Sequence, residues 1–205
     1  MVSRAIKKAE TRDLLIRAAG ELFSKNGFEG TTVDDVVALA GVSQRTFFRY
    51  FASKMDVAFP HHESRLGRLN ALIEQHFTPD NPVRSLQAAL IGFSASYQEA
   101  REELLREYEL IKASQTLLAK DLELDTQWEA LVCQTLLKGG LAQLEAAVLA
   151  GAIFGALRAS THHWFMGGCK QDLVQLARPT FQLLESLSKA YDEHDGIFGH
   201  KGAGH

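Results

Sequence analysis

Five polar residues between positions 44 and 54 have side chains that suit the bases and phosphates of double-stranded DNA: Gln44, Arg45, Arg49, Tyr50 and Lys54. An arginine can bond to O6 and N7 of a guanine together, and a glutamine amide can pair with adenine in the major groove. A tyrosine hydroxyl and a lysine ammonium suit phosphate oxygens. Such contacts require a short, exposed and rigid element that presents these side chains together.

The residues before this group predict a short amphipathic helix followed by a tight turn. Its apolar face repeats at the spacing of helical turns and consists of Val33, Val36, Val37 and Ala40. Thr32 and Asp35 form a capping-box pattern at its start. Gly41 is expected to end this helix, since glycine readily takes the backbone conformation that terminates helices.

A second short helix is predicted to follow, with Ser43 as its N-cap. Phe47 and Phe51 lie one turn apart and are expected to face inward, which leaves the polar residues on the outer surface. This arrangement is typical of a helix-turn-helix. A three-helix packing unit that contacts no DNA is the alternative, but it gives little reason for a row of exposed glutamine and arginine opposite an aromatic face.

The stretch from Thr11 to Phe59 resembles the DNA-binding domain of the TetR family of bacterial repressors. The match includes a preceding helix that ends at Asn26-Gly27 and has an apolar stripe of Leu15, Ala18, Ala19, Leu22 and Phe23. It also includes Ser53-Lys54-Met55-Asp56, where a helix restarts. The resemblance implies that the DNA is lined by Thr32, Ser43, Gln44, Arg45, Thr46, Phe48, Tyr50 and Lys54, to which we add the outward-facing Arg49.

One position departs from the family pattern. Where Phe48 stands, the family usually has a tyrosine whose hydroxyl holds a phosphate. Phenylalanine offers only van der Waals contact, so we assign the phosphate contact to Tyr50 and Lys54. The basic residues near the N-terminus, Lys7 and Lys8 among them, either add phosphate or minor-groove contacts or belong to a frayed terminus.

Composition and charge indicate a small basic head and a larger acidic body. The chain has 205 residues, of which 46% are hydrophobic, enough to form a core in each of two domains. Residues 1–59 carry nine lysines and arginines against seven acidic residues, and the remainder carries 13 against 18. We expect an N-terminal tail and helix-turn-helix domain over residues 1–53. We expect this domain to be followed by an effector-binding and dimerisation domain over 54–193 and by a disordered tail over 194–205.

Helical periodicity continues through the rest of the chain without strand alternation. This predicts an all-α fold of about nine helices, with a three-helix DNA-binding domain and a larger helical C-terminal domain. We expect a long helix from Lys54 to Glu74, a proline-rich loop at residues 77–82, and helices over 83–100, 102–112, 117–138, 141–164 and 172–192. Pro179 either kinks the last helix or marks a late start to it.

The longest apolar run covers residues 141–157. It contains Gln143 and Glu145 and is followed by Arg158, so we interpret it as a buried helix rather than a membrane span, and we expect no membrane partner. No leading apolar segment resembles a signal peptide, which makes the cytoplasm the expected location.

No metal or cofactor is expected. Cys133 and Cys169 are too few and too unpatterned for a disulfide framework or a metal site. Adjacent histidines such as His61 and His62 point about 100° apart on a helix and do not readily share one ion. The chain also shows no nucleophile elbow, phosphate loop or paired carboxylates in an apolar setting, so we expect no enzyme.

Small residues along the helix after Leu141 allow another helix to approach closely. In the TetR family the final two long helices of each subunit form a four-helix dimer interface, which implies a homodimer here. We expect the interface to contain Ala147, Gly151, Gly155, Leu176, Leu183 and Leu187. A dimer would read two half-sites of a palindromic operator.

Most of the chain also resembles a TetR branch described as acyl-CoA-like ligand-binding, which includes the mycofactocin-associated regulator. The matching stretches run from Arg45 to Glu63 and from Arg101 to Arg106. The resemblance implies a pocket for an acyl chain in the larger domain. Its expected lining is aromatic with a few polar groups: Phe93, Tyr97, Arg106, Tyr108, Trp128, Phe154, Arg158 and His162.

The acidic balance of the larger domain weighs against a polyanionic ligand, so a fatty acid, a neutral amphiphile or a lipophilic drug stays open. Core packing explains many of the same aromatic residues. We expect a small hydrophobic effector to pivot the helix after Lys54 and release a repressor from its operator, because a ligand shifts an equilibrium only by binding two states unequally. A DNA-binding dimer without an effector, or an activator, remains the alternative.

Overall fold

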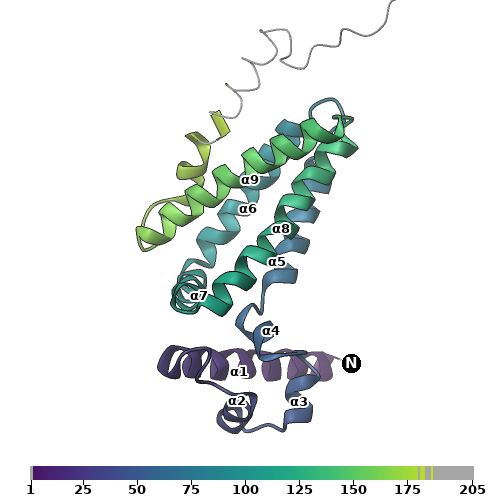
Figure 1. Ribbon diagram of the computed structural model, residues 1–205. Helices are drawn as coiled ribbons and strands as arrows, with labels where there is room; N and C mark the ends of the chain where they lie inside the picture. Colours follow the sequence, from purple (N-terminus) through teal and green to yellow (C-terminus); the bar gives the residue numbers. More distant parts are fainter. Residues whose placement is uncertain (1, 180, 183–185, 187–205) are drawn as a thin grey trace, which may run out of the picture. The chain divides into compact units, whose positions relative to one another are not determined.

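The computed structural model describes residues 2–179, 181, 182 and 186, and the regular elements in them are all helical (Figure 1). The first four helices are α1 (Val2–Asn26), α2 (Val33–Ala40), α3 (Gln44–Phe48) and α4 (Lys54–Ala58). The next five are α5 (His62–His76), α6 (Pro82–Glu99), α7 (Arg101–Ala113), α8 (Gln115–Lys138) and α9 (Gln143–Met166). Residues 173–179 are helical as well. The described residues contain no strand, which confirms the all-α prediction.

The helix expected from Lys54 to Glu74 is interrupted, so that prediction was wrong. Helix α4 ends at Ala58 and α5 begins at His62. Phe59 has φ −118° and ψ 55°, outside the helical region. Pro60 explains the break, because a proline disfavours helical backbone in the residue before it and has no N–H for the helical ladder.

Both ends of the chain bear on earlier predictions. Helix α1 begins at Val2, so Lys7 and Lys8 belong to a helix rather than to a frayed tail. At the other end, helical residues begin at 173, ahead of Pro179, which excludes a late start at the proline. The expected tail at 194–205 lies outside the described residues.

The contacts between residues divide the chain into two compact units. The head unit contains residues up to Gly67 together with 102–127, and the body unit contains 68–101 and the described residues from Trp128 onward. Helix α7 and the first half of α8 therefore belong to the same unit as the helix-turn-helix, a grouping that helical periodicity does not reveal. The domain limits 1–53 and 54–193 stay a prediction.

The head unit has its own hydrophobic core. Leu15, Phe23, Val36 and Phe47 from the first three helices are buried in it, as expected for a helix-turn-helix. The same cluster also contains Ile111 of α7 and the α8 residues Leu117 and Leu124. Burying such side chains stabilises the fold by about 1.5 to 3 kcal/mol each.

The body unit is a bundle built from the later helices. Its core includes Leu69 and Ile73 of α5, Leu86 and Leu90 of α6, Val132 and Leu136 of α8, and Ala146, Ala150 and Ile153 of α9. Gly92 of α6 lies beside Leu72 of α5, because a Cβ at this position would be 3.5 Å from the Leu72 side chain, an ordinary van der Waals distance.

Helix α9 is buried along one face only, which corrects the expectation of a buried helix. Its buried residues are Ala146, Ala150, Ile153 and Trp164. The large apolar side chains of Leu144, Val148 and Met166 are exposed in the single chain. Gln143–Met166 is long and apolar enough to cross a membrane by length and composition, with only 17% of its most apolar window buried.

Candidate nucleic-acid interface

Helix α2 has the cap that its sequence predicts. The Thr32 hydroxyl accepts a hydrogen bond from the Asp35 backbone N–H, and the Asp35 carboxylate accepts one from the Thr32 backbone N–H at 2.8 Å. The hydrogen bonds from Thr32 lower the pKa of the Asp35 carboxyl. At the other end Gly41 has φ 66°, a left-handed conformation that favours glycine. The turn between the two helices is thus defined at both ends.

Helix α3 is short and is anchored by one buried ring. Ser43 caps it by accepting a hydrogen bond from the Thr46 backbone N–H, and Phe47 is fully buried below it. Phe51 is also buried, at a ring-centroid distance of 5.7 Å from Phe47. These contacts leave the opposite face of the helix free to contact a partner.

The predicted DNA-binding residues are mostly on that outer face. Thr32, Ser43, Gln44, Arg45, Phe48 and Arg49 are exposed, whereas Thr46, Tyr50 and Lys54 are half-buried. The Gln44 amide donates a hydrogen bond to the Asp34 carboxylate of α2, a partner that spacing alone did not suggest. That bond orients Gln44 before any DNA is present.

Tyr50 lies in a cationic environment. Arg49 donates a hydrogen bond to its hydroxyl at 3.3 Å, and the guanidinium carbon is 5.0 Å from the ring centroid. Desolvation raises the pKa of Tyr50, but the Arg49 bond, Thr11 and the charge of Lys8 outweigh it, so the pKa is lowered. Positive charge around a hydroxyl suits a phosphate oxygen, and α1 contributes to it because it is helical from Val2.

Lys54 has a structural role that the sequence did not show. Its ammonium donates hydrogen bonds to the carbonyl oxygens of Phe28 and Thr31, both at 2.6 Å, and lies 4.2 Å from the centroid of the Phe28 ring. One of its three N–H donors is left for a phosphate. Lys54 therefore joins the start of α4 to the loop between α1 and α2.

Replacing Lys54 by methionine is expected to lower the free energy of unfolding by about 2 to 4 kcal/mol, because two carbonyls lose a charged donor. Phe28 and Thr31 are buried, so water does not readily replace it. Urea unfolding followed by circular dichroism measures the loss. Lys112, exposed on α7, provides the matched control in Lys112→Met, and equal losses in both variants would contradict the structural role of Lys54.

The segment between α4 and α5 is held from two sides in the head unit. Arg12 of α1 donates a hydrogen bond to the Pro60 carbonyl, and His61 Nε2 lies 3.5 Å from a Glu103 oxygen of α7. Arg65 of α5 bonds to Glu103 at 2.8 Å and to both oxygens of Glu107 at 2.8 and 3.0 Å. The helix break is thus a defined structure with partners on α1 and α7.

Comparison with known proteins decides the family. Residues 15–59 match the model of the bacterial regulatory proteins of the tetR family, and residues 80–188 match the model of the MftR C-terminal domain. The second match alone covers more than half of the chain. The chain belongs to the TetR family. It is a DNA-binding transcriptional regulator with a helix-turn-helix domain, of a family in which ligand binding and dimeric assembly are typical.

Relatives of this TetR regulator extend over nearly its whole length. A Mycobacterium tuberculosis protein named for transcriptional regulation of mycofactocin biosynthesis, MftR, is 23% identical over 91% of this chain and 90% of its own. A SmeT–triclosan complex aligns with a TM-score of 0.65 at 18% identity, over 87% of this chain and 91% of that one. FadR of Thermus thermophilus in complex with lauroyl-CoA aligns with a TM-score of 0.54 at 20% identity, over 95% and 98%.

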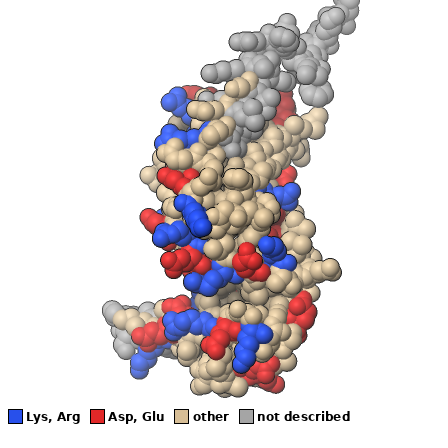
Figure 2. Space-filling model, turned by 90° about the vertical axis from the view of Figure 1, so that its left-hand side faces the viewer, with Lys and Arg blue, Asp and Glu red and all other residues tan. Residues whose placement is uncertain are grey.

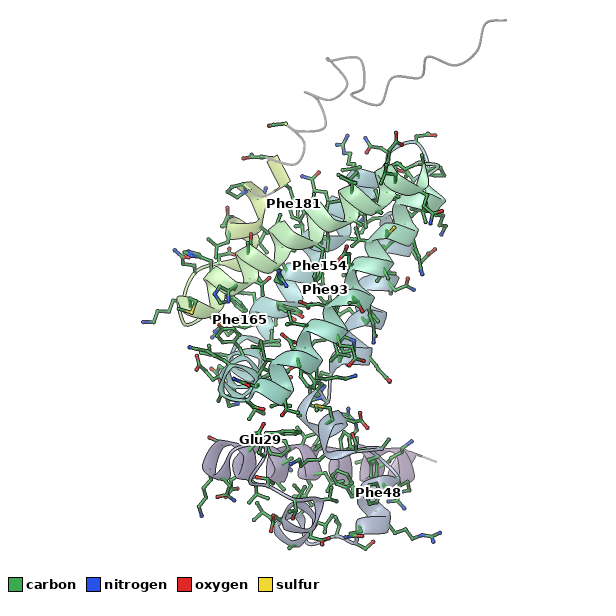
Figure 3. All side chains as sticks on the ribbon, in the orientation of Figure 1. Glu29, Phe48, Phe93, Phe154, Phe165 and Phe181 are labelled. Atoms are coloured by element: carbon green, nitrogen blue, oxygen red, sulfur yellow. The ribbon has the colours of Figure 1, made fainter. Side chains whose placement is uncertain are left out.

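The predicted ligand-binding residues of the TetR regulator are divided between the two compact units. Arg106 and Tyr108 belong to the head unit, whereas Phe93, Tyr97, Trp128, Phe154, Arg158 and His162 belong to the body unit. The structure brings three of them together: the Phe93 ring centroid is 4.9 Å from that of Tyr97 and 5.5 Å from that of Trp128. These three rings and Phe154 are half-buried, whereas Arg158 and His162 are exposed. Figure 3 labels Phe93 and Phe154.

Four of the six predicted dimer residues lie in the part of the chain that the structure describes. Ala147 and Gly155 are exposed on α9, and Gly151 and Leu176 are half-buried. Leu183 and Leu187 lie outside the described residues.

The face of the molecule drawn in Figure 2 has basic and acidic side chains interspersed rather than separated by sign. Among the described residues, no group of three or more His, Cys, Asp or Glu could hold a metal ion.

Proposed function

We propose that this TetR regulator is a repressor that binds a palindromic operator as a homodimer and is released when a small hydrophobic acyl ligand binds the body unit. The observation that carries the DNA part is the outer face of α3. Gln44 and Arg45 are exposed there, opposite a fully buried Phe47. A helix of this length reaches only a few base pairs, so two copies related by a two-fold axis are needed to read an operator.

The ligand part rests on the aromatic cluster of α6 and α8. Phe93 and Trp128 pack against the body core but remain half-buried, which leaves apolar surface for a chain-like ligand. Apolar walls with few polar groups are typical of such sites. The T. thermophilus FadR complex with lauroyl-CoA and the match to the MftR C-terminal domain favour an acyl group as that ligand.

Coupling between the ligand and DNA is proposed to use α5 and α8. Each has residues in both units: α8 contributes Leu124 to the head core and Val132 to the body core, and α5 has Arg65 in the head unit and Leu69 in the body core. A ligand that shifts either helix would therefore shift residues of the head unit. A coupling of about 1 to 3 kcal/mol corresponds to a 5- to 150-fold change in operator affinity.

A lipophilic drug is the second candidate for the effector. The SmeT–triclosan complex favours it, because its fold is similar and its ligand is a compact aromatic molecule. The aromatic cluster of Phe93, Tyr97 and Trp128 suits stacking with such a ring. Under this alternative the DNA-binding function is the same, and only the ligand class differs.

For either ligand we infer a cytoplasmic location, where the operator is accessible.

Selection from a pool of random duplexes tests the proposed function. We expect the purified dimer to enrich a palindrome whose affinity falls steeply with salt, because phosphate contacts release counterions. The palindrome then serves as the probe in a competition with lauroyl-CoA, lauric acid and triclosan. Release by the first two alone supports the acyl ligand, release by triclosan alone supports the second candidate, and an unenriched pool overturns the DNA-binding proposal.

Arg45 is expected to contact a base rather than only a phosphate. Arg45→Ala should weaken operator binding by about 5- to 150-fold for each half-site, and by the product of the two factors for the dimer, since a bidentate base contact contributes about 1 to 3 kcal/mol. It should also relax the base preference at one position of each half-site. Electrophoretic mobility shifts on operator and random duplexes measure both effects. Equal loss of affinity on the two kinds of DNA would assign Arg45 to phosphate contact.

A further inference from the structure

Phe48 is an exposed aromatic side chain on the outer face of α3. Its exposed fraction is 53%, and all other phenylalanines in the described part of the chain are buried or half-buried. Figure 3 labels it on this helix. An exposed phenyl ring provides apolar surface whose burial by a partner would be favourable.

The Phe48 ring has a defined orientation. The buried Phe47 ring contacts it in an edge-to-face arrangement, with centroids 5.3 Å apart and planes at 84°. The helix below is capped by Ser43 at its start and anchored by Phe47 in the core. A side chain with two rotatable bonds and a fixed neighbour loses little entropy when it binds, so Phe48 is prepared for a specific contact.

The neighbours of Phe48 indicate which surface covers it. Gln44 and Arg45 lie one helical turn before it on the same face, four and three residues earlier, and both are exposed. Their chemistry suits base edges in the major groove of DNA. Phe48 lies on the same face of α3 as Gln44 and Arg45, so a groove that those two side chains enter would also cover the Phe48 ring.

Phenylalanine limits what can be recognised there. The ring has no donor or acceptor, so it cannot hold a phosphate or a polar base edge. The C5-methyl group of thymine is the apolar group that the major groove presents. We propose that Phe48 reads the C5-methyl of one thymine in each half-site, which makes it a specificity-determining residue. This assignment rests on the proposed function, since it requires an operator.

The size of the effect follows from the single carbon involved. Burying one methyl or methylene group contributes about 0.8 kcal/mol, and each 1.4 kcal/mol is a factor of ten in affinity. Replacing that thymine by uracil, which keeps every hydrogen-bonding group and lacks the methyl, is expected to weaken binding about four-fold for one half-site. Replacing it in both half-sites is expected to weaken binding about 14-fold.

The experiment uses the operator recovered by selection and the full-length dimer. Each thymine is replaced by uracil in turn, and the dissociation constant is measured for the wild type, for Phe48→Ala and for Leu14→Ala. Leu14 is exposed on α1 and serves as the control for loss of a surface apolar side chain. Wild type and Leu14→Ala should lose about four-fold at one thymine position, whereas Phe48→Ala should bind both duplexes equally.

Two results would overturn the assignment. One is a wild type that binds every uracil duplex as tightly as the thymine duplex. The other is an unchanged preference for thymine in Phe48→Ala, with its fold verified by circular dichroism. Neither result would affect the proposed function, because the operator would still be bound. An unenriched pool in the preceding selection would instead remove the proposed function, and this assignment with it.

Discussion

Replacing Arg65 by alanine is expected to lower the free energy of unfolding by about 3 to 5 kcal/mol, because it leaves a buried carboxylate without its counterion. The Arg65 and Glu107 side chains are each only 15% exposed, and two hydrogen bonds of 2.8 and 3.0 Å join them. Urea unfolding followed by circular dichroism at pH 7 measures the change.

Burial already works against the Glu107 carboxylate when Arg65 is present. Desolvation raises the pKa of Glu107, although the charge and hydrogen bonds of Arg65 lower it. A carboxyl with a raised folded-state pKa destabilises the fold as pH rises through the window between its unfolded and folded pKa values. Without Arg65 the folded-state pKa of Glu107 rises further, because the charge and hydrogen bonds that lower it are lost. Protonation of Glu107 then removes the buried charge, so Arg65→Ala should recover stability as the pH falls from 7 toward 5.

An exposed ion pair provides the control. Lys138 bonds to Glu74 at 3.0 and 3.1 Å in the body unit, with side chains that are 51% and 56% exposed. Lys138→Ala is expected to change stability by less than about 1 kcal/mol, as exposed pairs usually do. A loss in Arg65→Ala no larger than this, or one that does not shrink as the pH falls, would show that Glu107 reaches solvent.

The local structure of the helix-turn-helix could be predicted from sequence because short-range signals define it. The Thr32–Asp35 capping box, the left-handed Gly41 and the Ser43 cap each involve residues within a few positions of one another. The inward-facing Phe47 and Phe51 follow from helical spacing alone. These features depend on residues close in sequence, so one sequence is enough to read them.

Features that depend on tertiary contact were missed. The hydrogen bonds from Lys54 to the carbonyls of Phe28 and Thr31 span more than twenty residues, and the local sequence pattern does not predict them. The pairing of Arg65 with Glu107 spans 42 positions and joins α5 to α7 within the head unit. The break at Pro60 is different, because the proline itself is a local signal for the end of a helix. The apolar repeat on both sides of it favoured a continuous helix, and that prediction was wrong.

The candidate ligand site shows the same division. Phe93 and Tyr97 are four residues apart on α6, so their contact could be expected from spacing. Trp128 joins them from α8, which follows from how the helices of the body unit pack and not from any pattern in the chain. Arg106 and Tyr108 were grouped with these residues by residue type alone, and they belong to the other unit.

Substituting Gly155 by leucine is expected to separate dimer assembly from the stability of the single chain. Gly155 is exposed on α9, and a Cβ built on it would meet no atom within 4 Å in the single chain. Removing a glycine from the middle of a helix stabilises the helix by roughly 0.8 to 1 kcal/mol. In a dimer that packs through this face, the leucine instead occupies space that the partner helix needs.

The loss of association free energy has two contributions, because a two-fold interface contains both copies of the new leucine side chain. Overpacking costs about 1 to 3 kcal/mol per site, so the two copies together weaken the dimer by at least about 2 kcal/mol, or roughly 30-fold. Sedimentation equilibrium across a dilution series measures the dissociation constant, and circular dichroism measures the helix content. We expect weaker association with undiminished helix content.

Gly20 provides the matched control for this substitution. It lies within α1, is exposed, and has no atom within 4 Å of a built Cβ, as at Gly155. Gly20→Leu should give the same gain in helix propensity and leave the dimer unchanged. If Gly155→Leu associates as tightly as Gly20→Leu, the interface lies elsewhere, and the exposed Leu144, Val148 and Met166 on α9 require another partner. Weaker association in Gly155→Leu alone would place the two-fold axis against α9 and explain why a helix this apolar is buried along only one face.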